Sequence, residues 1–152
     1  MKKYILIILL LTITACQFQE KEAETEVAEY QFKDLKIRSI KSGNQEINSK
    51  KNETQFDEIA DYLKNLTDQD LITGKRLHGA EEICSVTIKS ENDEISIIFK
   101  SDQKKKITAS FLKQNVNQSF INSLGRLEDG KELLQLLKKN GINCKQKIGH
   151  KV

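Results

Sequence analysis

Apolar and polar residues alternate in several short stretches of the chain, which is the pattern of β-strands with one buried face. The first stretch alternates over residues 35–40 and then meets a Ser42-Gly43-Asn44 turn. Three later stretches alternate in the same way over residues 84–89, 95–100 and 107–112. Short polar connections separate these three, so we expect an antiparallel meander. The "QEIN" segment at 45–48 is a weaker candidate for a further strand.

Two stretches have helical spacing instead. In the first, the apolar residues recur every three or four positions and therefore share one helix face: Phe56, Ile59, Leu63 and Leu66. The second is "DGKELLQLLKKNG", in which Asp129 and Glu132 have the spacing of a capping box and Gly141 provides a C-terminal stop. Its predicted buried stripe is Leu133, Leu134 and Leu137.

The order of elements is strand, helix, three strands, helix. Helices that cover the apolar face of an antiparallel sheet make a two-layer α+β domain. We therefore predict an antiparallel sheet of about four strands with two helices packed on one face.

The opposite face of this sheet is predicted to carry small hydroxyl residues from three strands: Ser85, Thr87, Ser96, Thr108 and Ser110. Such a flat, polar surface can receive a protein partner. An ordinary solvent-exposed face has the same composition, so both interpretations stay open. A run of lysines, residues 104–106, lies at a predicted turn, where it is either solvated or in contact with anionic lipid.

The N-terminal segment has a different pattern. Lys2 and Lys3 precede an apolar run over residues 4–13, and polar residues follow from Gln17. A transmembrane helix needs roughly 20 apolar residues, so this run is short for a membrane span. A basic start, an apolar centre and small residues at the end are the pattern of a secretory signal.

The end of this run, Ile13-Thr14-Ala15-Cys16, resembles the lipobox of bacterial prolipoproteins. That resemblance implies that the Cys16 thiol receives a diacylglycerol group, that residues 1–15 are removed as a signal peptide, and that Cys16 becomes the first residue. The protein would then be anchored by lipid to the cell membrane or outer membrane and face the periplasm or the cell exterior. Two alternatives are a Cys16 that pairs with another cysteine and an uncleaved N-terminal anchor.

The remaining chain divides by composition. Residues 16–29 are rich in Glu with few large apolar residues, so we expect a flexible acidic tether; a sorting signal for surface export is the alternative. Residues 30–145 are long enough for one α+β domain, and 146–152 form a basic tail. Loss of the signal lowers the formal net charge of +3 by its two lysines, to +1, which gives no electrostatic case for nucleic-acid binding.

Cys84 and Cys144 are the two other cysteines. An even pair outside the cytoplasm is a candidate disulfide. The alternative is two separate thiols, with Cys84 buried in a strand and Cys144 exposed near the tail.

Catalytic patterns are sparse, and we predict neither a cofactor nor a metal site. His78 precedes Glu81 and Glu82 at a spacing that can join a metal, but the second histidine of the common zinc motifs is missing. His150 lies in the basic tail. Nucleophile elbows and glycine-rich phosphate loops are also missing from the sequence.

These observations favour a lipid-anchored envelope protein that is not an enzyme. We expect it to act as a binding or inhibitory module, comparable to an immunity protein, with an envelope or secreted protein as partner. The contact would be made by the polar sheet face or by the loop 74–82. The alternative is a small metal-dependent hydrolase of the envelope that uses His78, Glu81 and Glu82.

Overall fold

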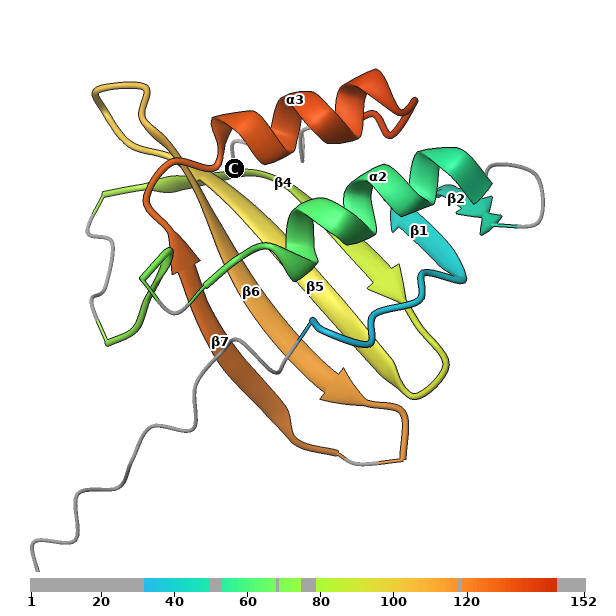
Figure 1. Ribbon diagram of the computed structural model, residues 1–152. Helices are drawn as coiled ribbons and strands as arrows, with labels where there is room; N and C mark the ends of the chain where they lie inside the picture. Colours follow the sequence, from blue (N-terminus) through green and yellow to red (C-terminus); the bar gives the residue numbers. More distant parts are fainter. Residues whose placement is uncertain (1–31, 50–52, 68, 75–78, 118, 145–152) are drawn as a thin grey trace, which may run out of the picture.

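The computed structural model describes residues 32–49, 53–67, 69–74, 79–117 and 119–144. These residues form one antiparallel sheet of seven strands with two helices on one of its faces (Figure 1). The strands are β1 (Ser39–Ser42), β2 (Gln45–Asn48), β3 (Leu71–Ile72), β4 (Glu81–Lys89), β5 (Asp93–Ser101), β6 (Ile107–Asn115) and β7 (Ile121–Leu127), in the spatial order β2-β1-β4-β5-β6-β7-β3. The helices are α2 (Glu53–Lys64) and α3 (Lys131–Lys139).

The prediction of about four strands is wrong, because β2, β3 and β7 also join the sheet. β7 was missed because a bulge disrupts its alternation: Phe111 of β6 pairs with Gly125 but Leu112 pairs with Ser123, so Leu124 is an extra residue. Gly125 has a φ of 119°, a conformation that favours glycine. β3 has only two residues, too few to give any periodic pattern.

The predicted meander corresponds to β4, β5 and β6, which pair in register over their whole length apart from a bulge beside Glu82. Their inward side chains, together with those of the helices, form one hydrophobic core. Members of this core that are fully buried include Val86, Ile88, Ile97, Phe99 and Phe111.

The chain before β1 is not the strand that the alternation over 35–40 predicts. β1 begins only at Ser39, and the preceding residues run across the helix-bearing side of the sheet. The Phe32 ring packs edge-on against Phe111, with ring centroids 5.8 Å apart. Leu35 and Ile37 are also buried. They are apolar because they pack on the face of the sheet, although they are not part of a strand.

The predicted apolar side chains of both helices are buried, although α2 ends at Lys64 and Leu66 therefore lies beyond it. The helices are linked across the surface by Glu58, which accepts hydrogen bonds from Lys139 at 2.6 Å and Asn140 at 3.1 Å. The Lys139 and Asn140 bonds hold the pKa of Glu58 below its usual value.

The ends of α3 differ in how well they follow the sequence. At the start, the predicted capping box does not form, because Gly130 is the N-cap and has no side chain. Asp129 instead accepts a hydrogen bond from the Lys131 amide at 3.0 Å. At the end, Gly141 has a φ of 76°, and the amides of Gly141 and Ile142 bond the carbonyls of Lys138 and Leu137. This is a Schellman motif, and it places the glycine stop where the sequence predicts it.

Several predictions concern residues outside the described part of the chain. They include the signal peptide, Cys16, the whole tether, His78, and the tail with His150. Within the described residues, no helix has both the length and the apolar character to cross a membrane.

Candidate functional site: the uncovered face of the sheet

The face of the sheet that points away from the helices is covered by no other layer of described residues (Figure 1). Side chains alternate between the faces of a sheet, so this uncovered face carries the residues between the buried ones. Two rows of cross-strand neighbours run across this face from β4 to β7. One row is Ser85, Ile98, Ser110 and Arg126, and the other is Thr87, Ser96, Leu112 and Ser123.

The five hydroxyl residues predicted for this surface do lie on the same face, but they are not equally accessible. Ser85 is exposed, and Thr87, Ser96 and Ser110 are half-buried. Thr108 is only 4% exposed. A partner that approaches the face can therefore reach four of the predicted residues, whereas Thr108 lies beneath its neighbours.

Sequence reasoning gave too little weight to the apolar centre of this face. Ile98 is directly opposite Ser110, and Leu112 is directly opposite Ser96, so Ile98 and Leu112 are diagonal neighbours on adjacent strands. Both are half-buried. Diagonal pairs lie within reach of long side chains. Their signal in the sequence is a second apolar residue beside a core residue, as in Ile97-Ile98 and Phe111-Leu112.

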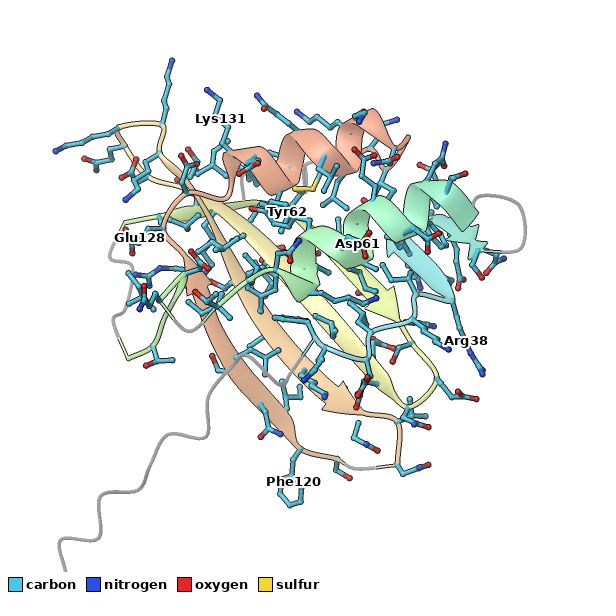
Figure 2. The ribbon with its side chains drawn as sticks, viewed as in Figure 1. Arg38, Asp61, Tyr62, Phe120, Glu128 and Lys131 are labelled. Atoms are coloured by element: carbon cyan, nitrogen blue, oxygen red, sulfur yellow. A yellow bond between two sulfur atoms is a disulfide. The ribbon has the colours of Figure 1, made fainter. Side chains whose placement is uncertain are left out.

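An ionic cluster closes one end of the face, where β7 leads into α3. Glu128 accepts hydrogen bonds from Lys106 at 2.7 Å and Arg126 at 2.6 Å, and lies beside the β7–α3 connection in Figure 2. These two bonds, the Lys106 one first, lower the pKa of Glu128 to about 2. The carboxylate therefore stays charged over the physiological pH range and holds both cations at the rim of the face.

The residues of the metal hypothesis do not form a site in the described part of the chain. Glu81 and Glu82 are consecutive residues of β4, where they pair with Ser101 and Lys100. Consecutive strand residues point to opposite faces. Among the described residues, no group of three or more His, Cys, Asp and Glu side chains is arranged to hold a metal ion. His78 lies outside the described residues.

A hollow of about 510 Å³ lies between the end of α2 and the start of α3. Its wall includes Tyr62, Asp70, Glu128 and Glu132. Burial, and then the charge of Glu132, raise the pKa of the Tyr62 hydroxyl. Asp70 is bonded to the amide and hydroxyl of Thr67, which lower its pKa, and Glu128 is held by its two cations. Asp70 and Glu128 therefore already have hydrogen-bond partners within the protein.

The structure joins Cys84 and Cys144 in a disulfide, with Cα atoms 5.5 Å apart. Cys84 is buried on β4, and Cys144 follows α3. The bridge therefore attaches the chain after the last helix to the helix-covered side of the sheet. The disulfide lies on the helix-covered side and does not involve the uncovered face.

No protein-family model, curated protein or solved structure matches this chain. Its function must therefore be inferred from the residues and their geometry.

Proposed function

We propose that the protein is a lipid-anchored lipoprotein of the bacterial envelope that binds a protein partner without catalysis, and that the uncovered face of the sheet is the contact surface. The lipobox-like segment ending at Cys16 supports the anchor. A binding role includes that of an inhibitor or immunity protein, whose task is to occupy the functional surface of a toxin or hydrolase outside the cytoplasm.

The observation that carries the binding role is the composition of the face. Ile98 and Leu112 supply an apolar centre, small hydroxyl residues surround it, and the cluster of Lys106, Arg126 and Glu128 lies at its edge. Non-obligate interfaces have this organisation, with few charges at the centre and a polar, charged rim. Seven strands in one sheet make the platform rigid, so little ordering of the backbone accompanies binding.

Capture from the native envelope tests this role. The full lipidated chain is used as bait, and partners are compared between the wild type, Ser110→Lys, and Gln135→Lys as a matched control. Ser110 is half-buried at the centre of the face, whereas Gln135 is exposed on α3, on the opposite side of the sheet. We expect Ser110→Lys to lose the captured partner and Gln135→Lys to retain it. Equal capture by all three chains would contradict the assignment of the face. Thr108 is unsuitable for this test because a charge there would be buried.

The inhibitory version has a separate test. When the captured partner is a toxin or hydrolase, its activity is titrated with the purified wild-type chain and with Ser110→Lys. Inhibition by the wild type and its loss in the variant are expected. Binding without any effect on the activity would leave a binding module that is not an antagonist.

Metal analysis distinguishes this role from a metal-dependent hydrolase. We expect the purified protein to contain no stoichiometric metal. One equivalent of zinc that is lost in His78→Ala would replace the binding proposal with the hydrolase.

A further inference from the structure

The connection between β6 and β7, together with the first residue of β7, exposes three large apolar side chains: Val116 at 67%, Phe120 at 74% and Ile121 at 62%. They are the large hydrophobic residues that stand out as exposed among the described residues. Phe120 points away from the body of the protein at the end of this hairpin (Figure 2). We call Val116, Phe120 and Ile121 the apolar tip. Single exposed apolar residues are common, whereas several on one hairpin make it a candidate contact site.

The sequence around the apolar tip is uncharged. From Gln114 to Gly125 there is no Asp, Glu, Lys or Arg, in a chain where these residues make up 31%. The neighbours of the tip are instead Asn, Gln and Ser. This composition suits the interface of a bilayer, where apolar side chains enter the acyl boundary and neutral polar groups stay among the headgroups.

The backbone of the tip is held in place by the neighbouring hairpin. The Val116 amide donates a hydrogen bond to the Asn92 carbonyl at 2.9 Å, and the Asn117 amide bonds the side chain of Asn115 at 2.9 Å. The Asn115 side chain in turn donates to Asp93 at 3.5 Å. Contact with a membrane would therefore not need to order this part of the backbone first.

The first described residue lies over the middle of β6, about equally far from this tip and from the other end of the strand. Phe32, the first described residue, packs on Phe111 of β6. Phe111 lies only four residues before Asn115, about 13 Å along the strand. The segment from Cys16 to Phe32 spans at most about 55 Å when fully extended. A lipid at Cys16 therefore keeps the apolar tip within reach of the bilayer surface.

From these observations we propose that the apolar tip inserts into the surface of the membrane that holds the lipid anchor. This inference rests on the anchor in the proposed function. Together with the lipid it gives the domain two points of attachment, so that the strands stand away from the bilayer. The uncovered face of the sheet then stays open to a partner that approaches from the side.

The opposite end of β6 provides the matched control. There the β5–β6 connection carries Lys104, Lys105 and Lys106, so one strand of nine residues separates a basic end from an apolar end (Figure 1). Contact of the basic end with anionic lipid is the competing orientation. A probe at each end therefore reports which one touches the membrane.

The chain has no tryptophan, so a single introduced tryptophan is a unique fluorescent probe. The lipidated full chain is reconstituted in phosphatidylethanolamine–phosphatidylglycerol vesicles with brominated acyl chains, as Phe120→Trp, Ile121→Trp and Lys104→Trp. We expect blue-shifted emission and bromine quenching for the first two variants, and solvent-like, unquenched emission for Lys104→Trp. The second tip variant guards against a local effect of one substitution.

Flotation with the vesicles separates the two ways in which this inference can fail. A chain that does not float overturns the lipid anchor and the tip contact together. A chain that floats but shows no quenching at either tip position overturns the tip contact alone. Quenching only in Lys104→Trp shows the opposite orientation and also overturns it. Blue-shifted emission without quenching means that protein covers the tip, either a second copy or a partner, and has the same consequence.

Discussion

Alternate residues of β4, β5 and β6 form the two faces of the sheet, and the two faces differ in burial and composition. The covered face carries Val86, Ile97, Phe99 and Phe111, which are fully buried against the helices and residues 32–37. The uncovered face has half-buried Ile98 and Leu112 among hydroxyl side chains, with charged residues toward its two ends. One face therefore contributes most of the stability, while the other is the contact surface that we propose.

This separation has a practical consequence. Stability depends on apolar area removed from water, so substitutions on the covered face should unfold the protein. Substitutions on the uncovered face should leave the fold intact and change binding alone. Adjacent positions on one strand therefore provide matched pairs of variants.

The largest difference between the faces is expected at Phe111 and its neighbour Ser110. Phe111→Ala removes a buried ring that contacts Phe32, and we expect a loss of roughly 3–5 kcal/mol in the free energy of unfolding. Ser110→Ala should change it by less than about 0.5 kcal/mol. Urea unfolding of the two variants and the wild type, followed by circular dichroism, measures both.

Phe111→Leu keeps this comparison measurable when the alanine variant does not fold. It retains part of the apolar volume and should give an intermediate loss. Similar losses for Phe111→Leu and Ser110→Ala would show that the two faces do not differ in the way proposed.

The disulfide tests whether the segment after α3 is part of the covered face. The Cys84–Cys144 bridge closes a loop with a separation of 60 residues. We expect the double variant Cys84→Ala/Cys144→Ala to lose roughly 2–4 kcal/mol in unfolding free energy. Reduction of the wild type should lower the unfolding free energy by a similar amount, which appears as a lower urea midpoint. An unchanged midpoint after complete reduction would show that the segment is held by other contacts.

A smaller effect is expected at Gly130, where α3 crosses onto the covered face. Its φ of −88° suits any residue, but an added Cβ would lie 2.8 Å from the Ala109 nitrogen and 2.9 Å from the Ala109 Cβ. We expect Gly130→Ala to cost about 2 kcal/mol through this overlap. Gly141→Ala meets no atom within 4 Å but adopts a φ of 76°, so backbone strain alone should cost about 1 kcal/mol. Thermal unfolding compares the two, and a Gly130→Ala variant as stable as the wild type would contradict the close contact.

The sequence predicts the covered face better than it predicts the edges of the sheet. Alternation identifies the long strands β4, β5 and β6 because each one buries every second residue. It fails for β7, where the bulge at Leu124 shifts the pattern, and for β3, where Leu71 and Ile72 pair with Leu127 and Arg126 without any local signal. It also assigns Leu35 and Ile37 to a strand because burial over a sheet leaves the same trace as burial within one.

The sequence predicts on which face of the sheet the candidate site lies, but it does not predict which of its residues are accessible. Alternation places Ser85, Thr87, Ser96, Thr108 and Ser110 on one face, as the structure does. Thr108 is 4% exposed, whereas Ser110 two residues along the same strand is half-buried, and the alternation does not distinguish the two. The sequence does not predict the apolar tip, because the spacing of Val116, Phe120 and Ile121 fits neither a strand nor a helix. Only their exposure at one hairpin identifies them as a group.

Thr108 is the one predicted partner-binding residue whose polarity should reduce stability. Its hydroxyl is buried and has no hydrogen-bond partner among the described residues. Thr108→Val keeps the shape and removes this group, so we expect a gain of about 1 kcal/mol in unfolding free energy. Thr87→Val, at a half-buried position, should change it by less than about 0.5 kcal/mol. Chemical denaturation of both variants tests this, and a destabilised Thr108→Val would indicate that the hydroxyl is hydrogen-bonded.

The smallest expected effect concerns Glu128 at the edge of the uncovered face, and it depends on pH. The pKa of Glu128 in the folded protein, about 2, is below the ordinary 4.5, so its charge stabilises the fold above pH 4.5 and this contribution is lost as the pH falls toward 2. The side chain is 40% exposed, and solvent screening limits the contribution to about 1 kcal/mol or less. Glu128→Gln should therefore be slightly less stable than the wild type at pH 7, and the two should converge near pH 2. Urea unfolding at pH 7, 4 and 2 measures the difference. Because neighbouring charges are screened at high salt, the difference in stability at pH 7 should also shrink in 1 M salt. A difference in unfolding free energy that stays constant at all three pH values would mean that the Glu128 charge does not stabilise this edge.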